Sequence, residues 1–346
     1  MSDLRIRLVQ SLGLILAIGL FLLFYLIYNF NHPRGFSSQI LIQNANESFV
    51  LVMVGMAQTV PALVGGLDLS VGAVMTMINT LASYLLVGWP LQILGGIVIC
   101  LATAALAGFV NGCLVVYGRI QPIIVTLATG AVYMGIALFL RPTPGGKVDG
   151  DFSWAMTNDL FELAATYGFA GDGDAAWFRP FAWLPLPLIL MVLVVLLVWL
   201  PFKNSVTGRG VYAVGSAEGA AYMSGVRVDR CKIAAFTMAG LFAGFAGLYL
   251  TLQTSSGNAD VPQAGAYTLN SIAAVVIGGT SLMGGSGGAV GSLFGALVIR
   301  SISFNFRIFD VDPLLQPLIE GIVLLGAVSI GAARIFRVRN KLELFG

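Results

Sequence analysis

Long apolar runs, separated by short polar stretches, account for most of the chain. Ten of these runs approach the length of about 20 residues that a helix needs to cross the hydrocarbon core of a bilayer. They fall near residues 8–30, 47–66, 70–88, 91–117, 121–140, 183–202, 233–252, 267–283, 288–306 and 313–333. The pattern predicts an all-α polytopic membrane protein with about ten transmembrane helices in a single domain, residues 1–346.

Two glycine-rich stretches interrupt the apolar pattern. The first, Gly65–Gly72, holds one carboxylate, Asp68, and is followed by a run to Gly118 without any Asp, Glu, Lys or Arg. The second covers residues 278–288. A membrane helix can unwind only where other protein or a water-filled cavity satisfies its backbone groups, and such discontinuous helices often border a transport path. We therefore expect a transport protein with discontinuous helices near residues 65–72 and 278–288.

The composition excludes an ordinary soluble domain. The chain is 58% hydrophobic and 10% charged, with a mean hydropathy of +0.90, whereas soluble domains carry about 25% charged residues. A net charge of only +2 gives no reason to expect nucleic acid as a partner. The 43 glycines favour close approach between membrane helices, because small residues let their backbones pack together.

The distribution of basic residues predicts the orientation. If the N-terminus is cytoplasmic, twelve of the eighteen basic residues fall on the cytoplasmic side, as the positive-inside rule requires. Ten crossings then place both termini in the cytoplasm. Two segments between helices are long: an acidic external loop, about residues 141–182, and a cytoplasmic segment, about residues 203–232. The external loop is either a docking or gating element or a solvated connector.

The cytoplasmic segment contains a stretch with the pattern of a short helix. Ser216 has the chemistry of an N-cap, Glu218 suits the positive end of the helix dipole, and Gly225 can end the helix. Such a helix would lie on the bilayer surface or in the groove of another protein. Because its polar face lacks the lysines usual on an interfacial helix, a protein partner is the favoured interpretation.

Asp68 admits two interpretations that do not exclude each other. It could shape a transport path or hold the glycine-rich break open, or it could cap the helix that follows. Uncharged polar residues in the predicted helices could line a path or bond between helices. The candidates for a substrate path are Gln58, Gly65, Gly66, Asp68, Ser70, Asn111, Thr126 and Tyr133.

Charge is scarce inside the predicted membrane region, where only Asp68 and Glu320 are ionisable candidates. Proton- or sodium-coupled carriers usually keep more such groups. We find no catalytic constellation, no metal-ligand spacing around the single histidine, His32, and no phosphate-binding loop of the Gly-x-x-x-x-Gly-Lys-Ser/Thr type. We therefore expect no enzyme activity and no cofactor in this chain.

Five stretches, taken in order, resemble one known family. Gly65–Gly72 is similar to the Gly-Gly-Ile-Asp-Leu-Ser-Val-Gly signature of bacterial ABC-importer permeases for ribose, xylose, galactose and related monosaccharides. The remaining stretches that resemble this family are residues 121–127, 208–215 with 218–225, 239–247 and 272–282. Together they extend over most of the chain, from about residue 48 to residue 330.

The resemblance implies a permease subunit in the bacterial inner membrane. A second permease, identical or related, would complete the path; cytoplasmic ATPase subunits would use ATP and Mg²⁺, and a periplasmic binding protein would deliver the sugar. It also implies that the cytoplasmic segment couples to the ATPase. The coupling candidates are Tyr212, Glu218, Ala220, Ala221, Ser224 and Gly225.

Two alternatives stay open at this point. The same architecture could carry a branched-chain amino acid, a nucleoside or a furanone-like signal, or the chain could be a secondary carrier that works alone. The sequence names neither the sugar nor the composition of the permease pair. Glu320 stands where the family more often has a basic or amide residue, and it could tune substrate choice or pair with a neighbour.

Overall fold

The computed structural model describes residues 3–166 and 183–315, with 318–319, 321–322 and 325–326. Every named secondary-structure element in these residues is a helix. The elements are α1 (Asp3–Asn31), α2 (Ser38–Leu63), α3 (Val71–Leu85), α4 (Pro90–Tyr117), α5 (Pro122–Leu140), α6 (Gly150–Thr157), α7 (Leu160–Thr166), α8 (Leu186–Val194), η3 (Val195–Trp199), α9 (Leu200–Asn204), α10 (Val206–Ser216), α11 (Glu218–Met223), α12 (Val228–Thr254), α13 (Val261–Ile277), α14 (Ala289–Ile308) and η4 (Pro313–Leu315).

The predicted membrane helices are confirmed as far as the structure describes them. Seven segments are long and apolar enough to cross a membrane: 13–31, 38–63, 90–117, 122–140, 186–204, 228–254 and 289–308. Two predicted runs form shorter apolar helices, α3 with 15 residues and α13 with 17. At 1.5 Å per residue these are roughly 22 and 26 Å long, less than the hydrocarbon thickness of about 30 Å. The tenth predicted run, 313–333, lies mostly outside the described residues.

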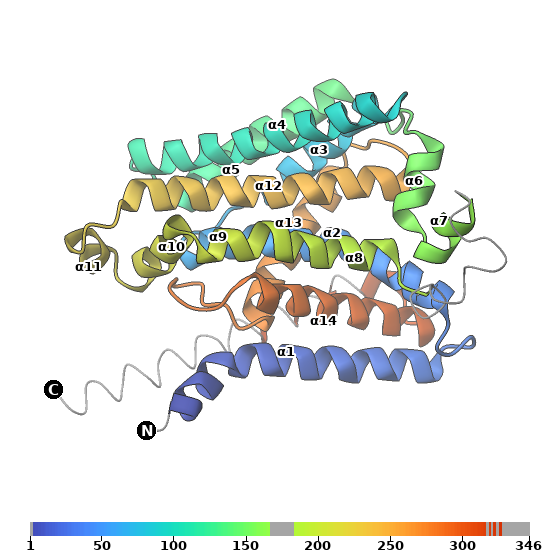
Figure 1. Ribbon diagram of the computed structural model, residues 1–346, viewed down its shortest axis with the longest axis horizontal. Coiled ribbons are helices and arrows are strands. Elements are labelled where there is room, and N and C mark those ends of the chain that lie inside the picture. Colours follow the sequence, from blue (N-terminus) through green and yellow to red (C-terminus); the bar gives the residue numbers. More distant parts are fainter. Residues whose placement is uncertain (1–2, 167–182, 316–317, 320, 323–324, 327–346) are drawn as a thin grey trace.

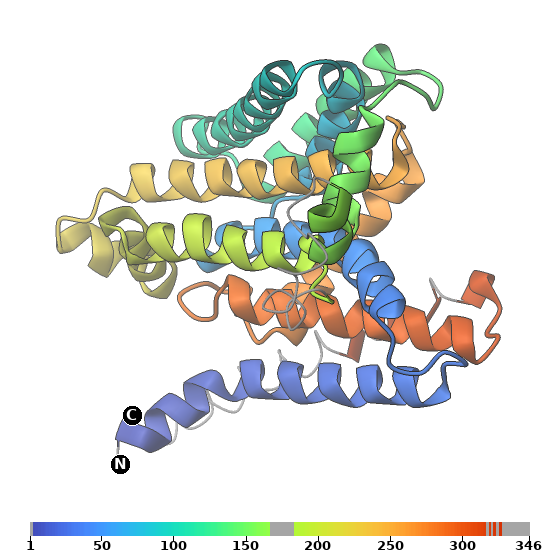
Figure 2. The same ribbon diagram turned by 45° about the vertical axis from the view of Figure 1, so that its right-hand side comes forward.

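The long helices run side by side, with α2 and α12 in the middle of the bundle (Figure 1). The beginning of α1 and the short helix α11 lie at one end of the bundle, while α6 and α7 lie at the other (Figures 1 and 2). This separation agrees with the predicted cytoplasmic and external ends. Helix α1 packs against α14, on the side of the bundle away from α4 and α5.

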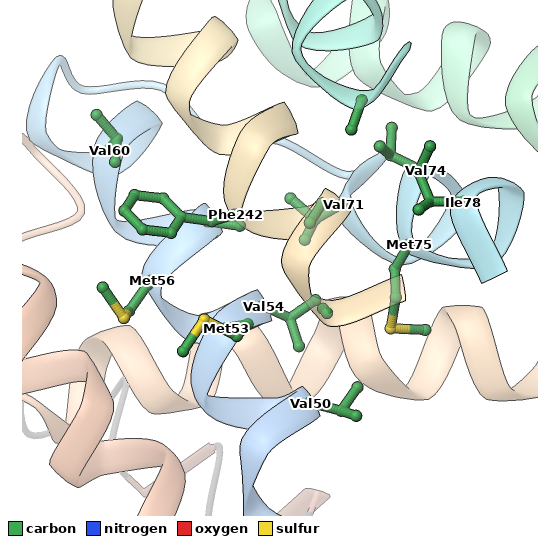
Figure 3. Close-up of a cluster of buried hydrophobic side chains, with 14 of the residues drawn as sticks. Val50, Met53, Val54, Met56, Val60, Val71, Val74, Met75, Ile78 and Phe242 are labelled. Carbon is green, nitrogen blue, oxygen red and sulfur yellow. The ribbon is translucent and has the colours of Figure 1, made fainter. Parts of the chain in front are cut away.

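Helix α2 forms the centre of the core, because neighbours enclose it on several sides. Figure 3 shows side chains of α2, including Val50, Met53 and Met56, beside Val71 of α3 and Phe242 of α12. All five side chains are almost completely buried. A helix enclosed by protein can also carry polar groups that meet partners on other helices. The outer helices must instead present apolar side chains to lipid.

Close packing of α4 against α12 confirms the expectation drawn from the glycine content. A Cβ atom on Gly108 would overlap the carbonyl oxygen of Phe236, and one on Gly240 would overlap that of Ala104. Gly112 lies one turn beyond Gly108 and also packs closely against the backbone of the facing helix, at Ile233. Small residues four apart therefore let the two backbones touch.

The cytoplasmic segment folds as two short helices instead of one. The prediction that Ser216 is an N-cap was wrong: Ser216 is the last residue of α10, and its hydroxyl donates to the Tyr212 carbonyl at 2.9 Å. Helix α10 begins after Ser205, which caps it by accepting from the Gly208 N–H at 3.0 Å, and its last turn packs against the end of α2. Helix α11 then starts after Ala217.

The external loop is partly helical, which the sequence pattern did not predict. Asp149 caps α6 by accepting from the Phe152 N–H at 2.9 Å, and α7 follows directly. Residues 167–182 of this loop lie outside the described residues.

Candidate transport site

The first break lies between the end of α2 and the beginning of α3. Gly65 adopts a φ of 75°, in the left-handed region that glycine tolerates best. The Gly66 N–H donates to the Pro61 carbonyl at 2.9 Å and the Gly65 N–H to the Ala62 carbonyl at 2.9 Å. The chain therefore leaves the helix with these carbonyl groups satisfied.

A directed chain of hydrogen bonds converges on Asp68. Its Oδ1 accepts from the backbone N–H of Ser70 at 2.9 Å and from the Ser70 hydroxyl at 2.6 Å. The Ser70 hydroxyl accepts from the Asn111 amide at 2.8 Å, and Asn111 Oδ1 accepts from the Tyr133 hydroxyl at 3.1 Å. The Ser70 and Asn111 donors point toward the carboxylate, which is 2% exposed. The Tyr133 hydroxyl also lies 2.9 Å from the Ala107 carbonyl, so its one proton is shared between two acceptors. Residues of α3, α4 and α5 thus meet at one acidic group.

Side chains of α2 and α5 satisfy the backbone of the same break. The Gln58 amide, oriented as its neighbours require, donates to the Asp68 carbonyl at 2.8 Å and accepts from its N–H at 3.2 Å. Thr126 Oγ1 accepts from the Leu69 N–H at 2.9 Å. These bonds supply what an unwound backbone needs inside a membrane.

The structure brings six predicted path residues into this one buried network, and the two glycines form its border. Gly66 packs against Pro122 and Phe236. The N-cap interpretation of Asp68 was wrong in detail, because Ser70 occupies the N-cap position of α3 and Asp68 bonds to Ser70. The network side chains are Gln58, Asp68, Ser70, Asn111, Thr126 and Tyr133, each at most 7% exposed. Their role in a path stays a prediction.

The two breaks touch each other, which sequence reasoning missed. The Gly285 N–H donates to the Leu63 carbonyl at 3.0 Å, and Gly284 lies directly against the backbone of Gly65. Gly284 and Gly285 have φ values of 91° and 75°. These positive φ values explain why glycine occupies both positions. Each of the two glycine-rich stretches did mark a break in the helices. No sequence pattern indicated that residues more than 200 positions apart would meet.

The end of α10 contacts both breaks. A Cβ atom on Gly215 would overlap the Leu63 carbonyl oxygen at the end of α2. The Tyr212 hydroxyl donates to the Gly287 carbonyl at 2.9 Å in the second break. Burial raises the pKa of Tyr212 to about 12, so the phenol keeps its proton and remains a donor at neutral pH.

Helix α11 extends from the bundle at the end predicted to be cytoplasmic (Figure 1). Glu218 pairs with Lys232 of α12 at 2.7 Å. Gly225 ends the helix as predicted, with a φ of 80° and its N–H donating to the Tyr222 carbonyl at 2.9 Å. Ala221 is 6% exposed and packs into the protein.

Two large residues of α11 that were not among the coupling candidates are strongly exposed. Tyr222 is 71% exposed and Met223 is 84% exposed. Two large apolar residues in succession within a polar segment were the available signal. Ala220 and Ser224, which were candidates, are also exposed, and the Ser224 hydroxyl donates to the Ala220 carbonyl at 2.8 Å.

Glu320 lies outside the described residues. His32 contacts the Tyr28 ring, at 5.4 Å between ring centroids. Among the residues that the structure describes, no group of three or more His, Cys, Asp or Glu side chains could hold a metal ion.

Comparison with known proteins shows which family the chain resembles in sequence. Residues 40–328 match the model of the family described as "Branched-chain amino acid transport system / permease component". The ribose import permease protein RbsC of Bacillus subtilis (strain 168) is 34% identical, with 93% of this chain and 92% of the relative covered. RbsC of Escherichia coli (strain K12) is 32% identical, with 86% of this chain and 87% of the relative covered.

A further relative, the fructose import permease protein FrcC of Rhizobium meliloti, is 32% identical over 81% of this chain and 74% of its own. No solved structure matched the chain. The family match includes both breaks and helices α10 and α11, and it confirms the resemblance stated from the glycine motifs. The chain therefore belongs to this family of membrane transport permeases.

Proposed function

We propose that the chain is the membrane permease subunit of an ATP-driven importer for a neutral monosaccharide in the bacterial inner membrane. The observation that carries this proposal is the likeness, over 77% to 93% of the chain, to relatives named as ribose, fructose, allose and xylose permeases. The family's own description names branched-chain amino acids, which keeps leucine as the second candidate cargo.

The exposed surface of α11 supports a cytoplasmic protein partner. Tyr222 and Met223 place two large apolar side chains at the end of the bundle, and no lysine lies within α11. An ATPase subunit would bind there, and Glu218 with Lys232 would hold the helix in place. Tyr212 and Gly215 would then carry a displacement of α11 to both breaks, because α10 contacts them directly.

The proposed path runs beside the Asp68 network, next to the two breaks. Neutral groups dominate that region, which suits an uncharged hydroxyl-rich cargo moved by an external energy source. A second permease chain would complete the path, and a periplasmic binding protein would deliver the sugar at the external end.

Reconstitution tests this function. The chain is placed in proteoliposomes with its ATPase subunits, the binding protein is added outside, and ATP is enclosed. We expect uptake of labelled ribose that requires both ATP and the binding protein, and we expect no uptake of labelled leucine.

Three results would contradict the proposal in different ways. Uptake of leucine without any sugar would make the chain an amino-acid permease. Uptake by the chain alone, driven by a proton gradient, would make it a secondary carrier. Uptake that does not respond to the binding protein would remove that partner.

A further inference from the structure

A polar pocket of about 430 Å³ opens at the external end of the bundle, far from the Asp68 network. Helix α2 supplies one wall from its first three turns, the end of α6 supplies another, and the last turn of α12 supplies the third. Its lining residues are Gln39, Ile42, Gln43, Asn46, Glu47, Thr157, Asn158 and Gln253. Seven of these eight carry amide, hydroxyl or carboxylate groups.

Some of these polar groups build the pocket. The Asn46 amide donates to the Thr157 carbonyl at 2.7 Å, and its oxygen accepts from the Tyr249 hydroxyl, so α2, α6 and α12 are joined at this point. Glu47 forms a two-pronged ion pair with Arg307 of α14. The carboxylate at the edge of the pocket is therefore neutralised.

Other groups keep hydrogen-bonding capacity. Within the described part of the chain, the Gln253 side chain makes no hydrogen bond, and it is exposed. The Gln43 amide donates to Glu47 at 3.2 Å, which leaves its oxygen available. Gln39 uses its oxygen to accept from Arg34 at 3.1 Å, which leaves its amide N–H groups available. Three glutamines thus offer both donors and acceptors around one opening.

We propose that this pocket binds a neutral monosaccharide at the external mouth of the permease, an inference that rests on the proposed function. The volume falls within the usual 300–1,000 Å³ range of small-molecule pockets. Ring hydroxyls need donors and acceptors in close proximity, which uncharged amides provide. Ile42 offers an apolar patch to the C–H groups of a sugar ring. A free amino acid is a poor fit, since the one carboxylate is already paired.

The same helix connects the pocket with the transport site. Glu47 and Leu63 lie 16 residues apart on α2, which at 1.5 Å per residue is roughly 24 Å. A sugar held in the pocket would therefore rest outside the first break, on the helix whose inner end forms it.

Saturation-transfer NMR on the full-length permease in lipid nanodiscs tests the pocket, with D-ribose as the probe and no binding protein present. We expect a ribose signal for the wild type. Gln253→Ala should weaken ribose binding about two- to tenfold, as expected for one lost hydrogen bond. Gln43→Trp, which fills the pocket, should abolish the signal. The matched control is Gln263→Ala on the first turn of α13, outside the pocket, which should bind as the wild type does.

Gln253→Ala keeps the test decisive if Gln43→Trp does not fold, because the Gln253 side chain is exposed and makes no bond to the rest of the described protein. A wild type without a ribose signal would overturn the pocket proposal, as would ribose binding unaffected by Gln253→Ala. Reduced uptake by Gln43→Trp with unchanged ribose binding would assign the pocket to a protein contact. The reconstitution assay distinguishes failure of the pocket proposal from failure of the proposed function. If the wild type takes up ribose in proteoliposomes but the pocket variants bind ribose as the wild type does, only the pocket proposal is refuted.

Discussion

Asp68 ends a chain of donors that begins at Tyr133 and passes through Asn111 and Ser70. The sequence made the carboxylate conspicuous, because it is followed by a long run without charge. Its partners could not be predicted, since Asn111 and Tyr133 lie 41 or more positions beyond Ser70 and only the packing of α3, α4 and α5 brings them together. Six of the path candidates nevertheless meet in one buried network, because a polar residue on a membrane helix needs a partner, and their role in a path stays a prediction.

Replacing Asp68 should affect stability before it affects transport. Asp68→Ala leaves the Ser70 N–H and hydroxyl without their acceptor and should lower folding stability by about 1–3 kcal/mol. Asp68→Asn keeps an acceptor oxygen and should therefore lose less folding stability than Asp68→Ala. The stability of both variants is measured by heating the protein in detergent and recording the fraction that stays monodisperse at each temperature.

The control for this pair is Asp260→Asn, at the N-cap of α13 on the predicted external side, where asparagine caps as well as aspartate. Full stability of Asp68→Ala with lost transport would contradict the structural account and would place Asp68 on the path.

Helix α10 is the element that sequence reasoning described least well. Motif resemblance placed a coupling function in residues 208–215, but the helical pattern there is short and glycine-rich, so it gave no boundary. Ser205 fixes the first turn of α10, and tight contact with the end of α2 fixes its last turn. Tertiary packing of this kind cannot be predicted from local propensity.

Removing the Tyr212 hydroxyl should loosen the connection between α10 and the second break. Tyr212→Phe loses a hydrogen bond worth about 0.5–1.5 kcal/mol and leaves the Gly287 carbonyl without that donor. We expect ATP consumed per sugar molecule to rise about twofold or more, measured as paired hydrolysis and uptake rates in proteoliposomes.

Tyr117→Phe is the matched control, since that tyrosine is 71% exposed at the end of α4. An unchanged ratio in Tyr212→Phe would show that the hydroxyl contributes nothing to coupling.

At the scale of the whole molecule, the hydrophobic pattern predicted the elements well because lipid demands long apolar helices. Nine of the ten expected runs are helices in the residues described. The charge pattern also predicted which segments share an end of the bundle, and the positions of α6, α7 and α11 agree with it (Figure 1). What the pattern could not give was the neighbour of each helix, because every apolar face is equally compatible with lipid and with protein.

The orientation can be tested with single cysteines in a variant whose three native cysteines are replaced by alanine. Trp89→Cys should react with a membrane-impermeant maleimide in intact spheroplasts, since Trp89 is 76% exposed in the predicted external turn before α4. Met223→Cys, on α11, should react only after lysis. The opposite labelling would reverse the orientation and move the proposed ATPase contact to the wrong side.

The bond from Gly285 to the Leu63 carbonyl has a consequence for how the inner end can open. That carbonyl belongs to the last turn of α2, where a helix has no partner of its own for its acceptors. Separating the two breaks therefore leaves an acceptor that only water can readily occupy. We therefore expect the two breaks to part only when water can reach the Leu63 carbonyl in place of the Gly285 N–H.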